Sequence, residues 1–305
     1  MPAGHTPDQN RDRQGAAPAY PSRPSPEAGD REAAAPLAAL RLLLPALGEA
    51  PAAASARGVH WLVPGGLLIG LIYAALYRSS WRVFGEVEDV RLIPALAVWL
   101  VDVTVFGLAM FLGVARTVDR WPGKPPGGLP QAATPASRLG TAGLLALIVV
   151  LVVKLVLWTA IPEGISGWPA DWRRHFNFMY PRPVFRPLIL APMWGRWGLI
   201  LAGSIARTAP QEGACLPGLR GARSTLTVMG WFLVNLAITA IYCGRQRRWM
   251  IGCIIGLAIL GVTYLFCVAS ARRFSGHTRF TVYAAAFLAE AAFLIFYLAA
   301  SQRIY

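Results

Sequence analysis

The chain has 305 residues, of which 55% are hydrophobic and only 14% are charged, and its mean hydropathy is +0.47. Since a soluble domain carries about 25% charged residues, this composition excludes an ordinary soluble protein. The net charge of +14 comes almost wholly from arginine. No nucleic-acid-binding motif accompanies it, so we exclude nucleic acid as a partner and expect the arginines to face anionic lipid head groups.

The N-terminal part is predicted to lie outside the bilayer. Residues 1–35 are rich in Ala, Pro, Gly and Arg and contain few large apolar side chains, so we expect a disordered tail. Residues 36–48 are apolar, but the run is short and is broken by Pro45. An interfacial helix fits this pattern better than a membrane span, and we expect no signal peptide.

Seven longer apolar runs follow, each close to the roughly 20 residues that a helix needs to cross a bilayer. We therefore predict an all-α, polytopic helical bundle that occupies residues 36–305 as one membrane domain. The predicted spans are, approximately, 61–77, 92–115, 140–160, 184–204, 226–243, 250–269 and 282–300. The fourth run gives the weakest signal, because it contains Arg196 and several Gly and Pro residues.

Because each span crosses the membrane once, successive loops alternate between the two membrane faces. The N-terminal tail and the loops 116–139, 205–225 and 270–281 fall on one side. Arg41 and Arg57 precede the first span, and positively charged residues near a span favour the cytoplasm. We therefore expect a multi-pass protein of the inner cell membrane, with this side in the cytoplasm.

Four ionisable residues lie inside the apolar runs: Asp102, Lys154, Arg196 and Glu290. Such groups are costly in a membrane and usually face a bundle interior or a polar cavity, so a functional role is one interpretation. Structural ion pairs are the other, such as Asp102 with Lys154 or Arg196 with Glu290. Lys154 can also be interpreted as an interfacial residue that snorkels. The sequence alone does not assign the pairs.

Several short motifs are spread along the chain. The most specific is SRLGTAG at residues 137–143, which is followed by an aliphatic run that contains Lys154. The others lie at 37–45, 66–70 (GLLIG), 107–109 (GLA), 195–196 (GR), 212–213 (EG), 276–278 (GHT) and Glu290. In order and spacing these segments resemble the adenosylcobinamide-GDP ribazoletransferase family, also called cobalamin synthase.

The resemblance implies a reaction in late cobalamin assembly. Members of the family join adenosylcobinamide-GDP to α-ribazole and release GMP, with Mg²⁺ held by aspartates on one helical face. Besides the lipid bilayer, the implied partners are cobinamide and nucleotide substrates, or other membrane proteins of the cobalamin pathway. The substrate-binding candidates at matching positions are Arg138, Thr141, Arg196, Glu212, Gly213 and Thr278.

This chain differs from the family at the acidic positions. Where the family carries aspartates, this chain has five vestigial positions: Phe106, Met110, Gly113, Ala136 and Phe280. The first three, which we call the signature positions, are spaced i, i+4 and i+7, and this spacing places them on one helical face. If ancestry is shared, these positions should cluster, with Glu212 and Arg138 nearby.

Neither Phe nor Met can ligate Mg²⁺, so no catalytic residue is assigned. Asp102 and Asp119 are the remaining metal-ligand candidates near the signature, and two scattered carboxylates make a poor site.

Three functions remain open. In the first interpretation the protein is an enzyme of this family with its own site, built from Asp102, Asp119, Glu212 and Glu290. Alternatively, it is a catalytically inactive membrane scaffold of the cobalamin pathway. In the third interpretation it is an unrelated transporter whose intramembrane charges line a path, although we find no internal repeat of the kind that transporters often show.

Overall fold

The computed structural model describes residues 58–84, 92–122, 139–161, 184–205, 224–243 and 249–304. Within these ranges the regular elements are all helical, and seven helices are long and apolar enough to cross a membrane. The predicted all-α membrane bundle with seven spans is therefore confirmed. The tail 1–35 and the interfacial segment 36–48 lie outside the described residues.

The first span is α3 (Leu62–Phe84), preceded by the short 3₁₀ turn η3 (Val59–Trp61). The second is α4 (Leu92–Val101), the π-helical segment η4 (Asp102–Gly107) and α5 (Leu108–Arg120), which follow one another without a break. The other spans are α6 (Thr141–Thr159), α8 (Phe185–Ile205), α9 (Thr225–Cys243), α10 (Trp249–Arg273) and α11 (Arg279–Ile304).

The helices extend beyond the apolar runs that the sequence marks. The first helix continues to Phe84, so that Arg78 and Arg82 are helical rather than loop residues, and α10 continues to Arg273. Hydropathy marks the part of a helix that lies in hydrocarbon. Arginine side chains at a helix end reach the head groups by snorkelling, so the helix itself does not have to stop where the apolar run stops.

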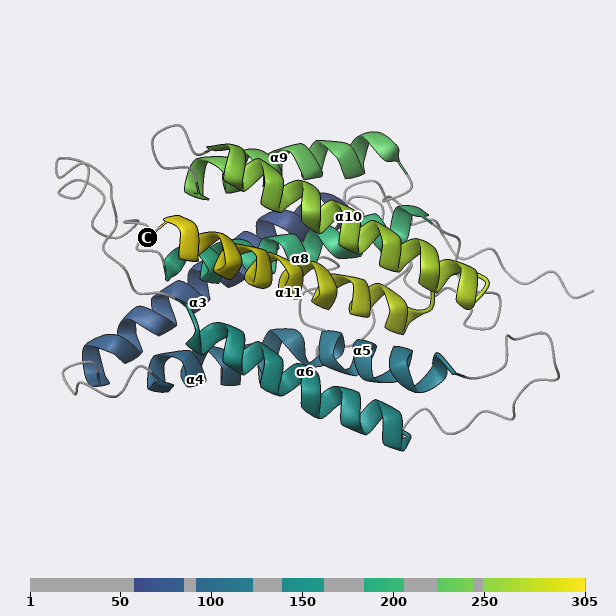
Figure 1. Ribbon diagram of the computed structural model, residues 1–305, viewed down its shortest axis with the longest axis horizontal. Coiled ribbons are helices and arrows are strands. Elements are labelled where there is room, and N and C mark those ends of the chain that lie inside the picture. The colour runs from purple at the N-terminus through teal and green to yellow at the C-terminus, as the bar shows by residue number, and fades with distance from the viewer. Residues whose placement is uncertain are drawn as a thin grey trace, which may run out of the picture.

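The centre of the bundle is α8, which packs most extensively against α3 and α11. In Figure 1 the α9–α10 hairpin lies on one side of α8 and α11, and α4, α5 and α6 lie on the other. Residues 186–202 of α8 are all buried. The run with the weakest apolar signal is thus the one most enclosed by protein, because an enclosed helix needs small residues for close packing more than it needs apolar side chains for lipid.

Two glycines of α3 allow it to contact the α8 backbone. A Cβ atom at Gly66 would lie 2.8 Å from Met193 Cα, and one at Gly70 would lie 2.6 Å from Ile189 Cα. Any side chain at either position would push the two helices apart. The GLLIG motif therefore serves helix packing within the bundle.

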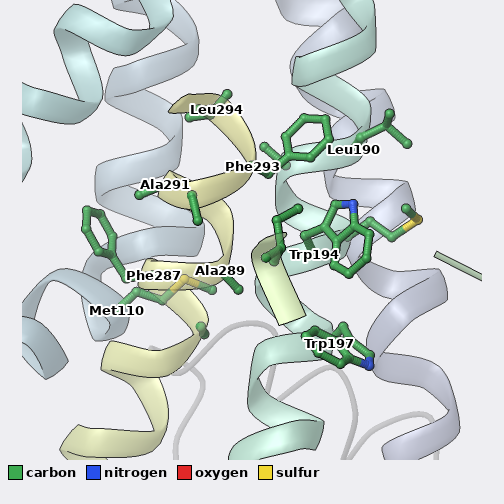
Figure 2. Packing of buried hydrophobic residues seen from close by; sticks show 14 of the residues in the cluster. Met110, Leu190, Trp194, Trp197, Phe287, Ala289, Ala291, Phe293 and Leu294 are labelled. Atoms are coloured by element: carbon green, nitrogen blue, oxygen red, sulfur yellow. The ribbon is translucent and has the colours of Figure 1, made fainter. Parts of the chain in front are cut away.

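Two tryptophans of α8 connect it to α9. Trp194 donates a hydrogen bond from Nε1 to Thr239 Oγ1 (3.0 Å), and Trp197 donates from Nε1 to the Val228 carbonyl (3.3 Å). Figure 2 shows the two indoles on the same side of α8, with α11 and its Phe293 nearby. Each indole N–H thus has a hydrogen-bond acceptor, while the ring fills the apolar core between helices.

The close approach of α3 and α8 predicts a strong position dependence for glycine-to-alanine changes. Gly66→Ala and Gly70→Ala should each lower the free energy of unfolding by about 1–3 kcal/mol, since the new methyl group overpacks the interface. The matched control is Gly230→Ala on α9, where a Cβ meets no atom within 4 Å. Thermal unfolding in detergent micelles measures the effect, and equal stability of all three variants would contradict the packing described here.

Candidate functional site

The second span widens into a π-helical turn at the position of its buried carboxylate. Asp102 is the first residue of η4 and Gly107 the last. A Cβ at Gly107 would lie 2.8 Å from the Asp102 carbonyl oxygen and 3.1 Å from Asp102 Oδ1, so only glycine lets this turn close over the carboxylate. Such π turns are frequent at functional sites of proteins, so Asp102 is a candidate functional residue.

Asp102 is the centre of a buried polar network between four elements. Tyr73 of α3 donates a hydrogen bond to Asp102 Oδ1 (2.6 Å). Lys154 Nζ of α6 lies 2.6 Å from Asp102 Oδ2 and 3.0 Å from Glu290 Oε1 of α11. Lys154 is 1% exposed, and the two acids are each 2% exposed. One ammonium group is therefore shared by two carboxylates, and it lies in the core rather than at an interface.

Aromatic rings surround the ammonium group of Lys154. Its Nζ lies 5.1 Å from the centroid of Phe111 and 5.9 Å from that of Phe287. Ring faces attract a cation. The centroids of these two rings lie 5.5 Å apart. Figure 2 shows Phe287 and Met110 close together on this side of α11.

Arg196 supplies the second buried cation. It is 2% exposed and donates from Nη2 to the Phe106 carbonyl (3.5 Å) and from Nη1 to Met110 Sδ (3.9 Å). Two cations, Lys154 and Arg196, thus accompany two carboxylates, Asp102 and Glu290, and their formal charges sum to zero. Glu290 pairs with Lys154, whereas Arg196 uses neutral acceptors on the second span. Charges buried in this way require partners because desolvation is costly.

The three signature positions of the second span point into the bundle. The ring of Phe106 meets Tyr73 edge-on at 5.8 Å, and Met110 is buried beside Arg196. A Cβ at Gly113 would lie 2.7 Å from Tyr283 Cβ and 2.9 Å from the Phe280 carbonyl oxygen. The face is therefore filled by apolar packing at its first two positions and by the α11 backbone at the third.

Phe280 lies next to Gly113, whereas Phe106 lies about 10 Å further along the same helix at 1.5 Å per residue. The Phe280 ring is covered by two cations, with Arg116 Cζ at 4.5 Å and Arg120 Cζ at 5.0 Å from its centroid. Three of the five positions thus follow one side of the second span, and the fourth, Phe280 of α11, lies beside Gly113. The fifth, Ala136, lies outside the described residues, as do the binding candidates Arg138, Glu212 and Gly213.

Asp119 has a structural task that the sequence did not reveal. Its Oδ2 accepts a hydrogen bond from the Gly140 amide (2.7 Å), and its Oδ1 accepts one from the Gly143 amide (3.1 Å). These amides belong to the first turn of α6, where N–H groups lack helical partners and the dipole favours an anion. The two glycines of SRLGTAG allow this approach. Thr141, the neighbouring binding candidate, is exposed.

The acids do not converge on one metal site. Asp102 and Asp119 are 17 positions apart on one continuous helical span, which corresponds to about 25 Å, so they cannot ligate the same ion. Asp102 and Glu290 meet, but through Lys154. In the part of the chain that the structure describes, no three His, Cys, Asp or Glu side chains are grouped so that they could hold a metal ion.

Thr278 caps the last helix. Its amide donates to Thr281 Oγ1 (2.9 Å), and the Thr281 amide donates to Thr278 Oγ1 (3.2 Å), which is a reciprocal cap at the start of α11. His277 is buried, with Nδ1 3.3 Å from Thr281 Oγ1. Burial lowers the pKa of His277 to about 4. Gly276 has φ of 139°, a conformation that needs glycine.

Removing the shared ammonium group is predicted to destabilise the protein strongly. Lys154→Met should lower the free energy of unfolding by about 3–5 kcal/mol, because Asp102 and Glu290 are then buried without a counter-charge. Neutralising both acids in the same chain (Asp102→Asn, Glu290→Gln) should restore most of the loss. Thermal unfolding of the purified variants measures this, and a Lys154→Met protein as stable as the wild type would refute the network's role.

The buried histidine predicts a loss of stability in acid. Since the folded-state pKa of about 4 lies below the ordinary value of 6.5, the unfolded chain binds more protons between these values. Stability should therefore fall as the pH is lowered through this range. His277→Asn should make the unfolding temperature less dependent on pH between about 7 and 4. If the two proteins respond to acid identically, His277 is not buried in its neutral form.

A family model described as cobalamin-5-phosphate synthase matches residues 37–298. The comparisons with curated proteins and with solved structures gave no match. Because the family model covers more than four fifths of the chain and extends into all seven spans, this protein belongs to the cobalamin-5-phosphate synthase family and is a multi-pass membrane protein of cobalamin biosynthesis.

Proposed function

We propose that this protein serves cobalamin assembly as a membrane-embedded partner or scaffold, without magnesium-dependent ribazole transfer of its own. One observation carries the proposal. The helical face of Phe106, Met110 and Gly113, where the family resemblance places aspartates, is occupied by apolar and backbone packing. Family membership excludes an unrelated transporter.

The family's reaction makes demands that this face does not meet. An acceptor hydroxyl attacks a phosphorus atom of the pyrophosphate, and a divalent metal neutralises the oxygens and aligns the reacting groups. Magnesium requires oxygen ligands. Phe106 and Met110 offer none from their side chains, and a carboxylate at Gly113 would collide with Tyr283 and meet the Phe280 carbonyl. The residues present do not fit Mg²⁺.

Electrostatics at the same face also disfavour a metal. Arg196 contacts both the Phe106 carbonyl and the Met110 sulfur, so a fixed positive charge lies where a divalent cation would have to bind. The nearest carboxylates, Asp102 and Glu290, are both paired with Lys154. A metal could recruit them only by displacing that ammonium, which would leave a buried cation unpaired.

The second candidate function is the family reaction itself, favoured by a match that spans nearly the whole bundle. An active site would then need ligands other than the signature face. Glu212 and Arg138 are the candidates that the sequence offers for it, and both lie outside the described residues.

The motif loops are proposed to face the cytoplasm. The end of α5, the start of α6 and the turn between α10 and α11 lie at one end of the bundle, where Arg273 donates to the Trp121 carbonyl and Asp119 caps α6. Several arginines are found at this end, and the positive-inside rule associates such residues with the cytoplasm.

A transfer assay tests the proposal directly. Purified protein supplied with adenosylcobinamide-GDP, α-ribazole and Mg²⁺ should release GMP no faster than the mixture without protein. A family member that retains its signature aspartates provides the positive control. Mg²⁺-dependent release by this chain, abolished by Glu212→Gln, would establish the second candidate and overturn the first.

The scaffold role has its own readout. Deleting the gene in its host should lower cobalamin yield, and the wild-type chain should restore it despite its inactivity in vitro. If the transfer assay is negative and deletion leaves the cobalamin yield unchanged, the protein is not a scaffold of this pathway.

A further inference from the structure

Five arginines gather where three helices meet at one end of the bundle: Arg116, Arg120, Arg272, Arg273 and Arg279. We call this group the arginine rim. Figure 1 shows the end of α5, the end of α10 and the start of α11 together at the same end of the molecule. None of the family motifs discussed above requires arginine at these positions.

Aromatic contacts hold the rim together. Arg116 and Arg120 both lie over the Phe280 ring, at 4.5 and 5.0 Å. Arg273 donates from Nε (2.9 Å) and Nη2 (2.7 Å) to the Trp121 carbonyl at the end of α5. The Trp121 ring in turn meets Phe274 edge-on at 5.8 Å. These contacts join Arg116, Arg120 and Arg273 of the rim across the ends of α5 and α10 and the start of α11.

The charge of this end is strongly positive. Among the described residues of this end (108–122, 139–143 and 264–281), Asp119 is the one acid, and its oxygens accept the amides of Gly140 and Gly143. Compensation of helix dipoles explains cations at the ends of α5 and α10. It does not explain Arg279, which begins α11 at the terminus where a cation is unfavourable.

The rim borders a surface suited to lipid. Val118 is 39% exposed and Trp121 39%, so apolar side chains next to Arg120 in the chain face outwards. Leu265, about two turns before Arg272 on α10, is 68% exposed. A ligand that suits both parts has an anionic head and apolar tails. Guanidinium groups bind phosphate oxygens through paired N–H donors, and tryptophan prefers the head-group level of a membrane.

We propose that the arginine rim binds the phosphate-bearing head group of an anionic phospholipid. The bound lipid joins α5, α10 and α11 at this end and neutralises part of their mutual repulsion. Binding adds stability to the folded state in proportion to its occupancy, so the protein should be more stable in membranes that contain anionic lipid.

Lipid titration of the detergent-purified protein tests the proposal. Phosphatidylglycerol should raise the unfolding temperature, and phosphatidylcholine should not. In Arg116→Gln/Arg120→Gln the apparent affinity for phosphatidylglycerol should fall roughly tenfold or more, since each arginine near an anionic surface contributes appreciably. The matched control is Arg82→Gln, an exposed arginine in the last turn of α3 at the opposite end of the bundle.

Control variants and a competing ligand distinguish a specific lipid site from other causes. If Arg82→Gln weakens binding as much as the double variant, the effect is net charge and the rim is not a site. If inorganic pyrophosphate stabilises the lipid-free protein as well as phosphatidylglycerol does, the ligand is a soluble phosphate compound and the lipid assignment is wrong. Should the double variant fail to fold, native mass spectrometry of Arg279→Gln reports retained lipid, and unchanged retention would also overturn the proposal.

Discussion

The position of Lys154 between Asp102 and Glu290 is the constraint on which the rest of the bundle depends. Charges in a membrane interior are tolerated when they are paired away from lipid. Among the seven spans α6 is the most exposed to lipid, with 17% of its most apolar stretch buried, and its buried residues are Gly143, Lys154 and Trp158. Lys154 therefore connects a lipid-facing helix to the second span and to α11.

Under the proposal that Phe106, Met110 and Gly113 stand where the family resemblance implies aspartates, this network also explains how the bundle remains stable. Several acids on one face of the second span would repel one another unless a metal neutralised them. With Phe106, Met110 and Gly113 in their place, that repulsion is absent, and α11 approaches until Tyr283 and Phe280 occupy the space beside Gly113. The remaining carboxylates are neutralised from within the chain. The formal charges of Asp102, Glu290, Lys154 and Arg196 thus sum to zero near the place where the family resemblance implies Mg²⁺.

The sequence predicted the seven spans because hydropathy is a local property of each segment. Hydropathy gave its weakest signal for α8, since a helix surrounded by protein is selected for packing and tolerates Arg196. The sharing of Lys154 by two acids was not predictable, because pairing depends on which helix faces meet. The role of Asp119 was missed for the same reason: its partners Gly140 and Gly143 belong to the next helix.

Metal binding tests the account's central claim most directly, because it does not depend on any substrate. Mn²⁺, which prefers the same oxygen ligands as Mg²⁺, can be titrated into the purified protein and followed by electron paramagnetic resonance. The account predicts weak binding that is the same in the wild type, Asp102→Asn and Glu290→Gln. Tight, stoichiometric binding that is lost in Asp102→Asn or in Glu212→Gln would contradict it and would show that this chain has rebuilt a metal site.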